Sequence, residues 1–151
     1  MTRSNARELA AHLIYEMDYT HETPSQVMDA RLERGYYDEL ASENEVYAER
    51  PSKKQMAYIK SCVEGVAERI GELDGYIAKF SMGWNINRIS RFTKAAMRLA
   101  MFEILYVEDV PTGVAINECV ELTRKYEDED VVSFVNGIMG SFARSLKETE
   151  K

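Results

Sequence analysis

Cysteine, proline and glycine are scarce in this chain of 151 residues, which contains two cysteines, three prolines and eight glycines. So few turn-forming residues argue against a turn-rich β-sandwich or barrel, and against a disordered linker protein. Cys62 and Cys119 stand 57 positions apart and have no histidine nearby. Because a zinc site needs about four ligands at close spacing, we interpret both cysteines as buried thiols that behave as small hydrophobic side chains.

The chain also lacks the signatures of membrane insertion, secretion and common catalysis. No apolar run approaches the roughly 18 residues that span a bilayer, and residues 1–7 lead into no apolar signal segment. The sequence contains no glycine-rich phosphate loop, no GxSxG motif and no HExxH motif, and His12 and His21 lack the spacing of metal ligands. These absences do not exclude an enzyme, but nothing in the sequence argues for one. We expect a cytoplasmic protein that is not an enzyme and that needs no metal and no cofactor.

The net charge of −7 is distributed unevenly. Residues 29–49 carry seven acidic residues and two arginines, and residues 127–130 are all acidic, so the rest of the chain has a net charge of +2. Within that rest, residues 79–98 contain five basic residues and no acidic one. A local basic surface attracts phosphate even when the whole protein is acidic. A solvated helix face without a ligand is the other interpretation of this pattern.

Apolar residues recur at spacings of three and four along most of the chain, which is typical of amphipathic helices. The longest such stripe runs from Met56 to Ile77. Thr23, which precedes a proline and stands three residues before Gln26, predicts the start of a helix. Residues 36–51 are polar and acidic, and we expect a loop there with one short turn at most. The whole pattern predicts an all-α fold of six to seven helices.

Several distinctive motifs follow one another along the chain. They are PTGVAINECVEL at Pro111–Leu122, FVNG at Phe134–Gly137, KAAMRLAMFE at Lys94–Glu103, Trp84 followed by Asn87-Arg88-Ile89, and an arginine-containing first helix from Arg3 to Tyr15. Over residues 1–19 and 52–146 these motifs, in this order, resemble the NusB family of transcription antitermination factors. A related helical module is fused to RNA methyltransferases of the RsmB type. No methyltransferase sequence follows here, which favours the free-standing factor.

The resemblance implies a fold and a role. The expected fold is a NusB-like bundle, one helical domain over residues 1–151, with two packed subdomains at about residues 1–80 and 81–148. The expected role is transcription regulation at terminators: binding of boxA-type RNA in nascent transcripts, together with a NusE-type small-subunit ribosomal protein, in the antitermination complex of RNA polymerase. The alternative is a helical protein-interaction module that has lost RNA binding. This alternative is consistent with the sparse arginines of the first predicted helix, in which Ser4 and Asn5 stand between Arg3 and Arg7.

Five residues are candidates for RNA contact. Arg3, Arg7 and Tyr15 follow one another at multiples of four and are expected on one solvent-exposed helix face. Lys79 lies beside Phe80, at a position where the resemblance implies an aromatic side chain that stacks on RNA. Guanidinium and ammonium groups bind phosphates, and aromatic rings stack on unpaired bases. Core packing is the competing interpretation of Tyr15 and Phe80.

The start of the last predicted helix is the candidate partner surface. Phe134 lies one residue off the apolar stripe, and Asp130 precedes it by one turn, so we expect both to contact the NusE-type partner. The competing interpretation places Phe134 in the core. Asn117 and Asn136 are expected to form buried or half-buried hydrogen bonds, and Gly137 to permit the close approach of another helix.

Overall fold

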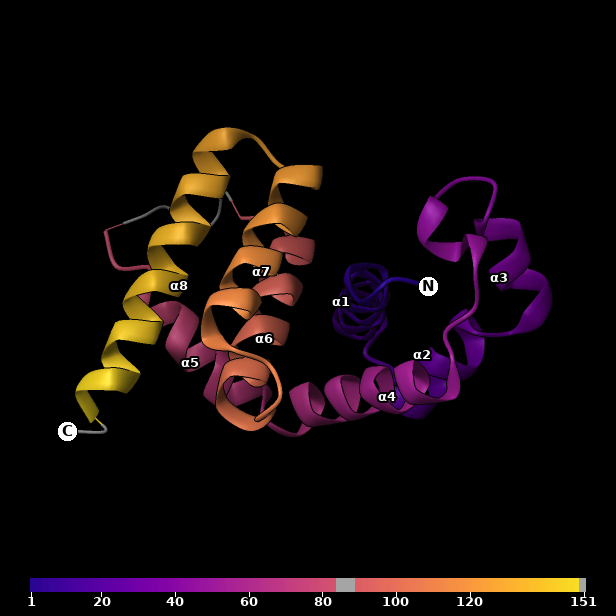
Figure 1. Ribbon diagram of the computed structural model, residues 1–151, viewed down its shortest axis with the longest axis horizontal. Helices are drawn as coiled ribbons and strands as arrows, with labels where there is room; N and C mark the ends of the chain where they lie inside the picture. The colour runs from indigo at the N-terminus through magenta and orange to yellow at the C-terminus, as the bar shows by residue number, and fades with distance from the viewer. Residues whose placement is uncertain (84–88, 150–151) are drawn as a thin grey trace. The chain divides into compact units, whose positions relative to one another are not determined.

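The computed structural model describes residues 1–83 and 89–149, and this part of the chain contains eight α-helices, one 3-10 helix and no strand (Figure 1). The predicted all-α fold is therefore confirmed. Contacts divide the chain into two compact units, Met1–Glu68 and Arg69–Lys151. The division near residue 80 that the resemblance implies stays a prediction. No helix in the described part is long and apolar enough to cross a membrane.

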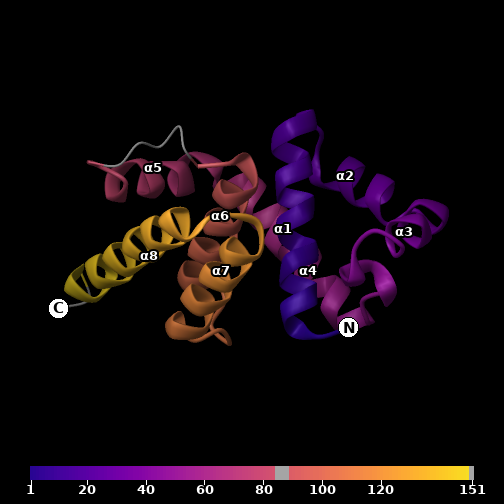
Figure 2. The same cartoon turned by 90° about the horizontal axis from the view of Figure 1, so that it is seen from above.

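The first unit is built around helix α1 (Arg3–Thr20), which packs against α4 (Lys53–Glu68), α2 (Pro24–Arg31) and the 3-10 helix η1 (Glu45–Ala48) (Figure 2). Leu9, Leu13 and Ile14 on α1 are completely buried. Burial of such a side chain contributes roughly 1.5–3 kcal/mol relative to its exposure to water. The apolar stripe of α1 therefore fixes the helices of this unit around it.

The helix starts in the first unit follow local hydrogen bonding. The Thr23 hydroxyl accepts a hydrogen bond from the Gln26 amide at 3.2 Å, and the Gln26 side chain accepts one from the Thr23 amide at 2.9 Å. This reciprocal capping box confirms the predicted start of α2. The expected loop over residues 36–51 is wrong in part. Helix α3 (Arg34–Leu40) occupies its beginning because the Glu33 carboxylate caps the amides of Gly35 and Tyr36.

The second unit contains α5 (Ile70–Phe80), α6 (Arg91–Tyr106), α7 (Thr112–Tyr126) and α8 (Glu129–Thr149). Helix α6 contacts α5, α7 and α8, as Figures 1 and 2 both show, and every residue from Ala95 to Glu103 is buried. Nine consecutive buried residues cover all sides of a helix with 3.6 residues per turn. The stripe predicted from Met56 to Ile77 is divided between α4 and α5, which meet at Arg69.

Candidate functional site

Arg3 and Arg7 occupy different environments on α1. Arg3 is exposed, whereas Arg7 is only 5% exposed, so the expectation that Arg7 lies on a solvent face is wrong. The six residues 6–11 are all buried, and six residues exceed one full turn, so this part of α1 is enclosed on every side. Each step of four residues also advances about 40° around a helix. A row of residues at this spacing therefore turns away from the face on which it begins.

Tyr15 is half-buried and lies next to a second aromatic side chain. Its ring stacks on Tyr19, with 6.3 Å between the ring centroids and an angle of 27° between the planes. Tyr19 is 62% exposed. The sequence analysis missed Tyr19, although its position four residues after Tyr15 was a usable signal. The two rings form a small aromatic surface at the C-terminal end of α1.

Lys79 and Phe80 lie together at the C-terminal end of α5. The Lys79 ammonium is exposed and lies 5.3 Å from the centroid of the Phe80 ring. Phe80 is half-buried and its ring meets that of Phe142 edge-on, with 6.2 Å between the centroids. One part of Phe80 therefore packs inside the second unit, while the adjacent cation faces solvent. The structure brings together the cation and the aromatic ring that sequence analysis paired.

The basic segment 79–98 supplies fewer exposed cations than its composition suggests. Arg91 is exposed and Lys94 is half-buried, but Arg98 is only 6% exposed. Arg98 donates to both carboxylate oxygens of Asp74, at 2.7 and 3.1 Å. Its charge is thus held inside the second unit. Trp84, Asn87 and Arg88 lie outside the described residues.

The two candidate partner residues at the start of α8 differ in their exposure to solvent. Asp130 is exposed, whereas Phe134 is 4% exposed and lies among the buried residues Val131 and Val135. The competing interpretation, that Phe134 belongs to the core, agrees with this burial. A partner contact at Phe134 stays a prediction.

Two further expectations about polar and small residues are wrong. Asn117 and Asn136 are exposed rather than buried. A Cβ atom added at Gly137 would meet nothing within 4 Å, so this glycine does not mediate a close helix approach. Asn117, Asn136 and Gly137 instead belong to the exposed surfaces of α7 and α8.

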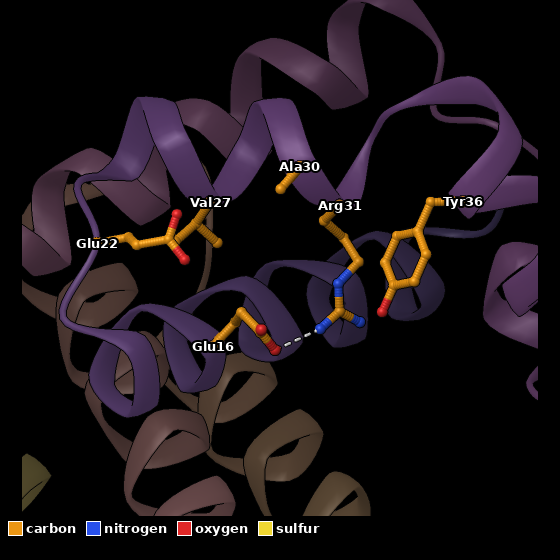
Figure 3. A pocket seen from close by; sticks show the side chains of 6 residues that line it. All are labelled: Glu16, Glu22, Val27, Ala30, Arg31 and Tyr36. Carbon is orange, nitrogen blue, oxygen red and sulfur yellow. Dashed lines mark hydrogen bonds and ion pairs between the residues drawn. The ribbon is translucent and has the colours of Figure 1, made fainter.

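A hydrogen-bonded network in the first unit was not foreseen, because none of the motifs that carry the resemblance lies in residues 20–51. Arg31 donates to the Glu16 carboxylate at 2.7 Å and to the Tyr47 hydroxyl at 2.8 Å (Figure 3 shows the bond to Glu16). The same hydroxyl lies 2.7 Å from Nδ1 of His12, whose ring stacks on that of Tyr47. Burial raises the pKa of Tyr47 to about 12, although the positive charge of Arg31 opposes this shift. The network joins α1, α2 and η1.

The two cysteines are free and buried, as the sequence predicted. Burial raises the pKa of the Cys119 thiol to about 12, so this side chain is protonated and unreactive at neutral pH. Among the described residues, no group of three or more histidine, cysteine, aspartate or glutamate side chains could hold a metal ion. The described surface thus offers cations, aromatic rings and carboxylates for binding.

Over the residues that the structure describes, these features define an all-helical protein in two compact units, each of which exposes charged and aromatic side chains. The model of the NusB family matches residues 4–144. The chain therefore belongs to the NusB family.

Curated relatives agree over nearly the whole chain. It is 37% identical over 144 residues to the transcription antitermination protein NusB of Acetivibrio thermocellus, covering 95% of this chain and 90% of that protein. It is 35% identical over 147 residues to the NusB protein of Clostridium perfringens strain SM101, covering 97% of this chain and all of that one (100%).

Solved structures give the same result for the fold. A crystal structure of the antitermination factors NusB and NusE in complex with dsRNA matches with a TM-score of 0.72 and 25% identity, covering 95% of this chain and 96% of the other. A structure of NusB from T. maritima matches with a TM-score of 0.74 and 25% identity, covering 95% of this chain and 92% of the other.

Proposed function

We propose that this protein is a non-catalytic transcription antitermination factor that binds boxA-type RNA in nascent transcripts together with a NusE-type ribosomal protein. The observation that carries the proposal is the match, over 95% of this chain, to a structure of NusB and NusE in complex with dsRNA. The family and its antitermination proteins support this role, and a factor that acts with RNA polymerase on nascent transcripts works in the cytoplasm. It acts as an adaptor that requires neither metal nor cofactor.

Each unit contributes RNA contacts of its own. On the first unit, exposed Arg3 binds a phosphate, and Tyr15 presents the edge of an aromatic surface. On the second, Lys79 binds a phosphate beside the ring of Phe80, which stacks on a base where it is exposed. Arg7, being buried, supports the conformation of α1 and does not contact phosphate directly.

The partner contact belongs to the exposed beginning of α8. Asp130 faces solvent there and can accept hydrogen bonds from a basic ribosomal protein. Phe134, one turn later, supports this surface from the core. An adaptor with few exposed cations should bind RNA weakly alone. When a second RNA-binding protein is bound to the adaptor, the adaptor's own contact with the RNA becomes intramolecular. This can raise the avidity for RNA by roughly 100-fold.

A binding assay with a short single-stranded boxA-type RNA tests the proposal. We expect weak binding by the protein alone and binding at least about tenfold tighter with the NusE-type protein present. Asp130→Ala should reduce this enhancement, and Asp109→Ala, which removes an exposed acidic residue between α6 and α7, should not. No RNA binding in either condition would contradict the proposal.

One observation favours the alternative of an interaction module without RNA binding. Arg7 is buried and Arg98 is paired with Asp74, so two of the cations that sequence analysis counted are not offered to phosphate. Under this alternative the NusE-type protein binds with unchanged affinity whether or not RNA is present. The assay above separates the two functions.

A further inference from the structure

The first unit contains a hollow of about 270 Å³ where α1, α2 and α3 meet (Figure 3). Its lining residues are Glu16, Glu22, Val27, Ala30, Arg31 and Tyr36. This volume is smaller than the roughly 300–1,000 Å³ of pockets that take drug-sized ligands. The hollow therefore suits a single extended side chain rather than a cofactor.

The positive charge in the hollow is already used. One terminal nitrogen of Arg31 binds Glu16 and the other binds the Tyr47 hydroxyl, and the Arg31 side chain is 13% exposed. Glu16 retains 35% exposure, and Glu22, the other carboxylate of the lining, is exposed (Figure 3). Two carboxylates and one guanidinium give the lining a net charge of −1. The hollow thus favours a cationic occupant.

The remaining walls suit an aliphatic stem that ends in a charge. Val27 is 1% exposed and forms an apolar surface together with Ala30. The ring of Tyr36 is 43% exposed at the side of the hollow. Lysine and arginine side chains lay their methylene groups along apolar surfaces, and their charged ends are attracted to the faces of aromatic rings.

We propose that this hollow receives a lysine or arginine side chain from a basic polypeptide partner. A polypeptide fits better than a free amine because α2, α3 and the turn between them also carry exposed carboxylates outside the hollow, at Asp29, Glu33, Asp38 and Glu39. Such a field guides a segment with several cations toward one anchoring position. The contact needs no RNA and goes beyond the function proposed above.

Titration of the isotopically labelled protein with the peptide acetyl-Gly-Arg-Gly-Arg-Gly-amide, followed by NMR, tests this site. Amide signals of the lining residues should shift, and a peptide with glutamine in place of both arginines should leave them unchanged. Glu22→Gln should weaken binding about fivefold because it removes a carboxylate close to the bound cation. Tyr36→Leu should weaken it about threefold through loss of the ring.

Glu43→Gln is the matched control, since it removes the same charge from an exposed position that does not line the hollow. It should weaken binding less than about twofold at physiological salt, where the Debye length is about 8 Å. Equal losses for Glu22→Gln and Glu43→Gln would show a diffuse acidic surface and overturn the proposal. Equal binding of the glutamine peptide would also overturn it. Neither result depends on RNA binding.

Discussion

The two units bury polar side chains in different ways. In the first, residues of three elements meet at one hydroxyl group, because Arg31 on α2 and His12 on α1 both contact Tyr47 of η1. In the second, the described bonds lie at several places: Arg98 of α6 binds Asp74 of α5, and the buried Thr93 hydroxyl accepts from Ser90 and donates to Glu127 after α7. A network centred on one group couples every element that it joins, whereas bonds at several places each couple fewer elements.

This difference indicates what holds each unit together. Titration of a single hydroxyl should affect several elements of the first unit at once. The second unit should depend more on apolar packing, since the inner face of α8 is buried at Val135, Ile138, Met139 and Phe142. The comparison between the two units is therefore tested by two kinds of substitution, one that removes apolar packing in the second unit and one that removes a titrating hydroxyl in the first.

The largest effect is expected for Phe134→Asp in the second unit. Phe134 is 4% exposed, and an unpaired carboxylate in its place loses the packing of the ring and is itself desolvated. We expect a loss of at least about 4 kcal/mol in the free energy of unfolding. Chemical denaturation measures this loss. Asp130→Ala on the same helix, at an exposed position, should cost no more than about 1 kcal/mol.

A stable, folded Phe134→Asp protein that has lost only its partner would contradict the core assignment. It would instead establish Phe134 as a direct interface residue. The denaturation curve and the binding assay must therefore be measured on the same preparation.

A smaller effect, confined to high pH, is expected in the first unit. The pKa of Tyr47 is raised by burial from 10.0 to about 12 in the folded protein. Because the folded state holds this proton more tightly, the stability it contributes is complete below pH 10 and is lost as the pH rises to 12. A shift of two units corresponds to about 2–3 kcal/mol.

Tyr47→Phe should remove this part of the pH dependence, as measured by denaturation at pH 9 and at pH 12. The pKa of Tyr37 and of Tyr106 is also raised, so the difference between the two proteins is the relevant quantity. Identical pH profiles for Tyr47→Phe and the unaltered protein would show that the network does not govern the alkaline stability of the first unit.

Local signals along the chain predicted local structure well. The capping box at Thr23 depends on residues three positions apart, so sequence alone specified it. The expected exposure of Arg7 was wrong because its burial depends on the complete enclosure of residues 6–11, which spacing along one helix does not reveal. The network at Tyr47 joins residues 16 and 35 positions apart, and no local pattern announces such a pairing.

The motifs identified the family of the protein but did not show which of its side chains are buried and which are exposed. Asn136 and Gly137 belong to a distinctive motif, yet both are exposed, and a Cβ atom added at Gly137 would meet nothing within 4 Å. The composition of residues 79–98 likewise suggested that Arg98 could bind phosphate, although its guanidinium group is hydrogen-bonded to Asp74 inside the second unit. Recognition of the family and placement of its side chains thus rest on different information.

The salt dependence of RNA binding tests the central claim most directly. Arg3→Ala removes an exposed cation from the proposed RNA surface, and Arg34→Ala removes an exposed arginine at the start of α3 as a matched control. With boxA-type RNA, we expect Arg3→Ala to reduce the slope of log affinity against log salt by about 0.7, and Arg34→Ala to leave it unchanged. Unchanged slopes for both variants would contradict the assignment of the α1 surface to RNA.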